Sequence, residues 1–195
     1  MNIAIIDYNA GNTQSVRYAL ERLGTSAIIT NKKEEILAAE KIIFPGVGQA
    51  KSAMTELRKS GLDLLIPNLK QDVLGICLGM QLLCTYTEEG DIDGLGIFPN
   101  KIKKIPAGNI VPHTGWNQIY GNSTELLKGI KEMEHMYFVH SYFADVSDCT
   151  ISKSNYHAPF SAALQKDNFY ACQFHPEKSG DRGQRIIENF LNLKK

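Results

Sequence analysis

Cys77 has the surroundings of a reactive cysteine. It lies within residues 75–79 (GICLG), between an apolar run at 73–76 and an apolar stretch at 80–84. A glycine on each side permits a tight strand-to-helix turn, in which a side chain at either flank would obstruct the neighbouring backbone. Such a turn strains the cysteine and projects it at the positive end of a helix, where a thiolate is favoured. The pattern predicts a nucleophile; the alternative is a buried structural cysteine in a glycine-rich turn.

Residues 175–177 (HPE) offer the base that a cysteine nucleophile needs. Pro176 disfavours a helix, and in an extended segment residues i and i+2 face the same side, so Glu177 is predicted to reach the imidazole of His175. With Cys77 these residues would form a Cys/His/Glu triad. The alternative is a surface turn with an incidental histidine.

Residues 44–48 (FPGVG) follow an apolar run and contain two glycines. The glycines let backbone N–H groups turn toward a ligand, so the N–H groups of Val47 and Leu78 are candidate donors to an oxyanion. Taken alone, this segment also reads as an ordinary turn. The spacing of the five histidines suggests no metal site, and the proposed chemistry needs no cofactor. The other cysteines are predicted to be core residues: Cys84, Cys149 and Cys172.

Composition narrows the class of partner and substrate. The 195 residues carry 21 Lys plus Arg and 21 Asp plus Glu, so no broad basic field favours nucleic acid or an anionic membrane. The first apolar run has no basic leader, and no stretch approaches the roughly 20 apolar residues of a membrane helix. The cysteines lack CxxC pairing, which favours a reduced compartment. We therefore expect a soluble cytoplasmic protein that acts on a small neutral or zwitterionic molecule.

The elements that must position these residues alternate along the first half of the chain. Apolar runs and helical stripes follow one another, which predicts an α/β fold with a central, mainly parallel, twisted sheet flanked by helices. After Gly90, turn signals separate short β-like segments, which predicts an antiparallel extension of the same domain. We expect a single domain across residues 1–195. Strands are predicted at 3–7, 27–30, 41–44 and 73–76, and helices over 16–23, 50–57, 80–84 and 179–193.

Four further segments carry a resemblance. With the PGVG, GICLG and HPE segments in this order along the chain, it resembles class I glutamine amidotransferases, and in particular the glutaminase subunits of imidazole glycerol phosphate synthase, over residues 3–193. Asn9 stands where this pattern has glycine, and Thr114 where an apolar residue is usual. The segments are 7–12 (DYNAGN), 112–117 (PHTGWN), 137–142 (YFVHSY) and 173–180 (QFHPEKSG).

The resemblance implies a glutamine site and a partner surface. Glu89 would hold the α-ammonium group of glutamine, although the residue also reads as a solvated loop charge. Asn12 would face the partner, although it also suits a helix N-cap. The implied glutamine-binding residues are Gly48, Gln81, Glu89, His140, Ser141 and Tyr142. The implied partner-interface residues are Asn12, Trp116, Tyr137 and Lys178.

The same resemblance implies hydrolysis of glutamine through a cysteine thioester. The ammonia would pass to a barrel-shaped cyclase subunit, in a heterodimer that makes imidazole glycerol phosphate for histidine biosynthesis. Two alternatives stay open. One is a paralogous glutaminase that feeds a related synthase, such as one for amidino-sugar formation; the other is a non-catalytic regulatory subunit, against which the intact Cys77, His175 and Glu177 argue.

Overall fold

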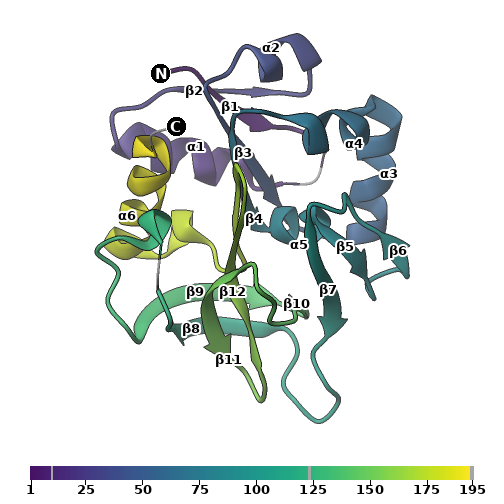
Figure 1. The fold of residues 1–195 in the computed structure, drawn as a ribbon, viewed down its shortest axis with the longest axis vertical. Coiled ribbons are helices and arrows are strands. Elements are labelled where there is room, and N and C mark those ends of the chain that lie inside the picture. Colours follow the sequence, from purple (N-terminus) through teal and green to yellow (C-terminus); the bar gives the residue numbers. More distant parts are fainter. Residues whose placement is uncertain (10, 123, 194–195) are drawn as a thin grey trace.

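A seven-stranded sheet forms the centre of the computed structural model, which describes residues 1–9, 11–122 and 124–193 (Figure 1). From β13 to β2 the neighbouring strands are parallel, whereas β12 and β11 continue one edge in antiparallel order. The predicted α/β class, with a mainly parallel sheet and antiparallel strands, is therefore confirmed. The strand order is β11 (Thr150–Asn155), β12 (Pro159–Lys166), β13 (Phe169–Cys172), β4 (Asp72–Cys77), β3 (Lys41–Gly46), β1 (Ile3–Ile6) and β2 (Ala27–Thr30).

Each face of the sheet has its own apolar core. Ile3 and Ile5 point into one core and Ala4 and Ile6 into the other, because successive side chains of a strand alternate between faces. The central strands are consequently apolar without interruption, as expected of parallel strands covered on both faces. The first core is completed by α1 (Thr13–Arg22), α6 (Gly180–Asn192) and the ribbon of β8 (His113–Ile119) and β9 (Glu134–His140).

The second core lies under four short helices and a second sheet. Figure 1 shows α3, α4 and this sheet on the side of the main sheet away from α1 and α6. The helices are α2 (Lys33–Leu37), α3 (Ala50–Ser60), α4 (Leu62–Leu65) and α5 (Leu78–Leu83). The second sheet has the order β10 (Tyr142–Ala144), β7 (Phe98–Lys104), β5 (Cys84–Thr87) and β6 (Ile92–Asp93). Single 3-10 turns occur at η1 (Ile66–Asn68), η2 (Glu125–Leu127) and η3 (Pro176–Lys178).

The boundary predicted at Gly90 was placed too late. The second sheet already begins at Cys84, which ends α5 with an extended backbone, and β5 pairs with β7 in parallel. The apolar helical stretch at 80–84 is thus a six-residue helix over Leu78–Leu83, followed by a strand of β-favouring residues. Ala10, within the DYNAGN segment, lies outside the described residues. Among the helices described, none has the length and apolar character needed to cross a bilayer.

Candidate active site

Cys77 occupies the turn between β4 and α5. It is the last residue of β4, and α5 begins at the next residue. Its backbone has φ 53° and ψ −108°, a left-handed conformation that is costly for a residue with a side chain. The parallel pairing of Cys77 with Gly46 of β3 holds this conformation from the other side. The side chain is nearly buried, with 6% of the residue exposed.

Glycines surround Cys77 because backbone segments approach one another there. A Cβ at Gly79 would collide with the carbonyl oxygen of Phe44 on β3. A Cβ at Gly75 would lie 2.7 Å from Cδ1 of Leu83, on the helix that folds back over the strand. The sequence predicted this steric role for both flanking glycines, and the contacts confirm it.

His175 and Glu177 form a buried pair. Nδ1 of His175 lies 2.8 Å from Oε1 of Glu177, and each side chain is 1% exposed. Burial by itself would lower the pKa of His175, but hydrogen bonding and charge from Cys77 and Glu177 outweigh it and raise the pKa to about 10. The pairing with Glu177 fixes Nδ1 as the protonated nitrogen that donates to the carboxylate, which leaves Nε2 for chemistry.

The backbone that produces this pair differs from the predicted one. His175 is extended, but Pro176 starts the 3-10 turn η3, so Glu177 does not lie on the same side of a strand as His175. The turn itself brings the carboxylate back to the ring. The N–H of His175 donates to the carbonyl of Tyr137, and the Ser179 hydroxyl donates to the carbonyl of His175. Pro176 is therefore a helix-starting residue here, which its fixed φ allows.

Nε2 of His175 is buried and has no hydrogen-bond partner within the described residues. Its contact with Cys77 is therefore looser than a normal hydrogen bond, although it contributes to the raised pKa of His175. Loose nucleophile–base contacts are usual in the absence of substrate. The second carboxylate oxygen of Glu177, Oε2, is likewise buried without a partner in the part of the chain described.

A cavity of about 230 Å³ opens beside Cys77. Its volume lies below the usual range for drug-sized ligands, which suits a small amino acid. It brings together nine residues that the sequence predicted as nucleophile, oxyanion donor or glutamine ligand: Val47, Gly48, Cys77, Leu78, Gln81, Glu89, His140, Ser141 and Tyr142. Pro112 and Val139 complete the lining, whereas His175 and Glu177 do not reach it.

Glu89 links this cavity to α3. One of its oxygens accepts the N–H of Ala50, the first residue of α3, at 2.8 Å. Partial burial raises the pKa of the Glu89 carboxyl, and the Ala50 N–H offsets part of that rise. The residue is therefore not the freely solvated loop charge of the alternative interpretation.

His140 lines the cavity with a ring whose nitrogens are already used. Nδ1 lies 2.9 Å from the carbonyl oxygen of Tyr142, and Nε2 lies 2.9 Å from Nδ1 of His113. Burial, and then the nearby His113, lower the pKa of His140 to about 3, and burial lowers the pKa of His113 to about 4. Both rings are neutral at physiological pH, so His140 would meet a ligand through its ring face or backbone.

Gln173 is a polar residue of the site that the sequence argument did not single out, although it opens the QFHPEKSG segment. It is fully buried on the chain leading from β13 to His175. Its Nε2 lies 3.7 Å from Sγ of Cys77, and its Oε1 accepts from Nε2 of Gln81 at 3.0 Å. The signal available in the sequence was its spacing, two residues before His175 on an extended segment.

The predicted partner residues lie outside the cavity. Trp116 on β8 is 54% exposed and packs edge-on against Tyr137 of β9, with ring centroids 6.0 Å apart. Lys178 is exposed at the end of η3. Asn12 caps α1 by accepting the N–H of Ser15, so the predicted N-cap role is confirmed.

Asn9 and Thr114, the two departures from the family pattern, occupy positions that tolerate these residue types. Asn9 has φ 60°, a left-handed conformation that glycine favours and asparagine tolerates. Thr114 is exposed on β8, two residues before Trp116 and so on the same side of the strand.

The remaining cysteines differ in exposure. Cys84 and Cys172 are buried core residues as predicted, but Cys149 is only half-buried. Cys149, in the turn that leads into β11, packs against the second core without being enclosed by it, so its core assignment holds only in part. Within residues 1–9, 11–122 and 124–193, no group of three His, Cys, Asp or Glu side chains could hold a metal ion.

Comparisons with known proteins point to one family along nearly the whole chain. Residues 4–193 match the glutamine amidotransferase class-I family. The imidazole glycerol phosphate synthase subunit HisH of Bacteroides fragilis is 55% identical, covering 99% of this chain and 100% of the relative. The subunit of the same name from Bacteroides thetaiotaomicron is 53% identical with the same coverage.

Solved structures share the fold. A glutamine amidotransferase crystal structure superposes with a TM-score of 0.74 at 18% identity, covering 97% of this chain and 96% of that one. The structure of PurLQS from Thermotoga maritima also gives 0.74, at 16% identity, covering 98% of this chain and 97% of that one.

Proposed function

The chain belongs to the class I glutamine amidotransferases and, within them, to the family of imidazole glycerol phosphate synthase subunits, and we propose that it hydrolyses glutamine at Cys77 for a synthase partner. The observation that carries this proposal is the strained Cys77, which lies at the cavity wall beside the buried His175–Glu177 pair. The match over residues 4–193 and the shared central sheet support treating residues 1–195 as one glutaminase domain.

In the first half of the proposed reaction, the Cys77 thiolate attacks the side-chain carbonyl carbon of glutamine. The carbonyl π electrons move to oxygen and give a tetrahedral oxyanion. His175, protonated at Nε2, then gives that proton to the leaving nitrogen, and ammonia departs as the carbonyl re-forms in a thioester. The raised pKa of His175 supports this step, because it keeps the ring protonated when the thiolate attacks.

In the second half, neutral His175 takes a proton from a water molecule at Nε2. The resulting hydroxide attacks the thioester carbon, the C–S bond breaks, and glutamate leaves as the Cys77 thiolate is restored. Glutamine and water thus become glutamate and ammonia. Glu177 supports both halves by holding Nδ1–H, so that Nε2 gives and takes the proton.

Backbone donors at the cavity mouth would stabilise the oxyanion. Leu78 is the first residue of α5, and a first-turn N–H has no partner within its own helix. Val47 lines the same cavity from the loop after β3, and Gly48 beside it has φ 102°. We assign Val47 and Leu78 as the two oxyanion donors.

The cavity's remaining residues would bind the amino-acid end of glutamine. Glu89 supplies the negative charge for the α-ammonium group, because its carboxylate lines the cavity and one oxygen alone is committed to Ala50. Further ligands assigned here are Gly48, Gln81, His140, Ser141 and Tyr142, of which His140 contributes through ring face or backbone.

The relatives are named as subunits of a synthase, so a partner subunit is expected. We propose a barrel-shaped cyclase that receives the ammonia and makes imidazole glycerol phosphate in histidine biosynthesis. We place the complex in the cytoplasm, where the environment would keep Cys77 reduced. The proposed contact surface is Asn12 at the start of α1, Trp116 on β8, Tyr137 on β9 and Lys178 in η3.

The test is glutamate production by the chain alone, with the cyclase, and with the cyclase plus its nucleotide ligand. We expect weak activity alone and strong activity in the third condition, together with glutamine-dependent imidazole glycerol phosphate. Stimulation only by a different synthase would favour the paralogous glutaminase. Absence of hydrolysis with every partner would instead support a regulatory subunit.

A further inference from the structure

The amide of Gln173 is held in one orientation by its neighbours. Gln81 uses both hydrogens of its Nε2, one on the carbonyl of Tyr142 at 2.9 Å and one on Oε1 of Gln173 at 3.0 Å. Oε1 of Gln173 is therefore the acceptor, and its Nε2 must be the end that faces Cys77. The main-chain N–H of Gln173 donates to the carbonyl of Ala162, which anchors the residue to β12.

Besides the loose contact with His175, Sγ of Cys77 has two polar neighbours with opposite preferences. The carbonyl oxygen of Val139 lies 3.7 Å away and can only accept, so it favours the protonated thiol. Nε2 of Gln173, also 3.7 Å away, can only donate, so it favours a negatively charged sulfur. The donor comes from a side chain with no exposed surface, where water cannot replace it.

We propose that Gln173 is a positioning residue that orients the Cys77 sulfur and stabilises its thiolate through this amide hydrogen bond, with Gln81 holding the amide in place. This inference rests on the proposed function, since it gives Gln173 a part in preparing the nucleophile. Core packing alone would not require a carboxamide here. The Gln173 carboxamide, by contrast, hydrogen-bonds both to the Cys77 sulfur and to the cavity-lining Gln81. An apolar side chain of similar volume would fill the same space without either hydrogen bond.

Several other titratable groups lie near Cys77 and would affect a pH titration of its alkylation. Tyr8 follows β1, and burial and then Cys77 raise its pKa far above the usual value. Cys172 lies at the end of β13, where burial and then Glu177 and Cys77 raise its pKa. His175 and Glu177 approach from η3, and the neutral His140 from β9. Within these surroundings Gln173 is the side-chain amide donor found at the sulfur.

The experiment measures the pH dependence of Cys77 alkylation by iodoacetamide in the full chain, read by mass spectrometry. The variants are Gln173→Met, which removes both hydrogen bonds, and Gln173→Glu, which keeps an acceptor for Gln81 but replaces the donor. We expect the alkylation midpoint to rise by about one pH unit in Gln173→Met, which is about tenfold slower alkylation at pH values below the midpoint. Gln173→Glu should shift it further at pH values where the new carboxyl is ionised, because a carboxylate would repel the thiolate.

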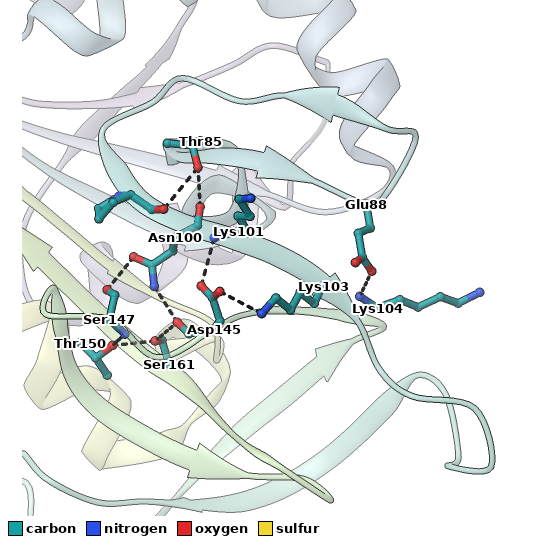
Figure 2. Close-up of polar contacts among 11 residues, drawn as sticks. Thr85, Glu88, Asn100, Lys101, Lys103, Lys104, Asp145, Ser147, Thr150 and Ser161 are labelled. Atoms are coloured by element: carbon teal, nitrogen blue, oxygen red, sulfur yellow. Dashed lines mark hydrogen bonds and ion pairs between the residues drawn. The ribbon is translucent and has the colours of Figure 1, made fainter.

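Asn100 provides the matched control. It is a buried carboxamide, 1% exposed, whose Nδ2 donates to the carbonyl of Asp145 and whose Oδ1 accepts from the Ser147 hydroxyl. Figure 2 shows these two contacts of Asn100 on β7, within a polar cluster that also includes Thr150 of β11 and Ser161 of β12 from the main sheet. Asn100→Leu removes a comparable pair of buried hydrogen bonds away from the cavity. It should lower the melting temperature as Gln173→Met does, but leave the alkylation midpoint unchanged.

An unchanged midpoint in folded Gln173→Met or Gln173→Glu would overturn the inference, as would an equal shift in Asn100→Leu. If Gln173→Met does not fold, Gln173→Glu decides the matter by the same readout. The proposed function is judged separately, by glutamate production of the wild type and of Cys77→Ala with the partner. Activity that persists in Cys77→Ala would refute the nucleophile, whereas an unshifted profile in an active enzyme would refute only the role of Gln173.

Discussion

Replacing Glu177 with glutamine tests whether this carboxylate controls the charge of His175. The two side chains meet at 2.8 Å with each 1% exposed, so solvent screens their interaction little. The variant Glu177→Gln keeps an oxygen that can accept Nδ1–H but removes the negative charge. Loss of a neighbouring anion destabilises the imidazolium, so the pKa of His175 must fall.

The size of the fall in the His175 pKa can be worked out from the hydrogen bond between Nδ1 and Glu177, which loses its charged acceptor. A hydrogen bond to a charged group contributes roughly 1.5 to 3 kcal/mol, which corresponds to about one to two pKa units. The pKa of His175, raised to about 10 in the wild type, should therefore fall, by an amount on the order of one to two pH units. Cys77 supplies the rest of the rise, so Cys77→Ala should lower the same pKa independently.

The assay is an NMR titration of the His175 ring, combined with glutaminase kinetics in the complex. His113 and His140 do not interfere, because their pKa values are lowered to about 4 and about 3. Glu177→Gln should reduce kcat by about ten- to a hundredfold, and His175→Ala by more, within the roughly 10²- to 10⁴-fold expected of a general acid–base. A His175 midpoint that is identical in wild type and Glu177→Gln would refute the charge coupling. Equal and negligible losses of activity would reduce the pair to an incidental turn.

Four further outcomes are expected. Cys77→Ala should abolish glutaminase activity without lowering the melting temperature, and it should leave the partner able to use free ammonium; surviving glutamine hydrolysis would rule out the nucleophile. Iodoacetamide should modify Cys77 first and half-buried Cys149 next, with glutamine protecting Cys77; peptide mapping that finds Cys84 or Cys172 ahead of it would contradict the assignment. Gly79→Ala should lower the melting temperature by roughly 4 to 8 °C, since its Cβ meets the Phe44 carbonyl, whereas Gly11→Ala makes only ordinary contacts and serves as control. Trp116→Ala should keep the melting temperature within about 2 °C but weaken cyclase binding at least about tenfold by calorimetry, and unchanged affinity would remove Trp116 from the interface.

The fold was predictable where local periodicity and burial agree. The strands β1, β3 and β4 read as apolar runs because both of their faces are covered, and α1 and α3 read as amphipathic helices. Gly61 ends α3 in a left-handed conformation, and a glycine after an apolar helical stripe is the usual sequence signal for such a helix end.

The second sheet could not be read in the same way. In it β5 pairs in parallel with β7, and nothing in the sequence of either segment indicates which strand it pairs with. The register of this pair depends on tertiary packing. Cys84 ends an apolar run that suits a helix or a buried strand equally well. The strand state prevails because β5 pairs there with β7 and β6, and no property of residues 80–84 alone reports that pairing.

The site shows the same division between local and non-local information. The elbow at Cys77 is local, since its glycines follow from contacts within a few residues and the adjoining β3. Contacts that depend on tertiary arrangement were missed, among them the Gln173–Cys77 contact and the pairing of His113 with His140. Side-chain amides and neutral histidines carry no signal in composition, because their role depends on which partner the fold brings within reach.

The strand β9 connects the proposed partner surface to the chemistry in three successive residues. The carbonyl of Tyr137 accepts the N–H of His175, and that of Val139 lies 3.7 Å from the Cys77 sulfur. Between them Phe138 packs in the first core, which limits sliding of the strand. On the outer side, β8 pairs Trp116 with Tyr137 and Thr114 with Val139. A partner that presses on the exposed Trp116 would therefore act on both the base and the nucleophile. Val139 also lies beside the same sulfur as the Gln173 amide, so we expect a partner-induced displacement of β9 to change the polar contacts of Cys77.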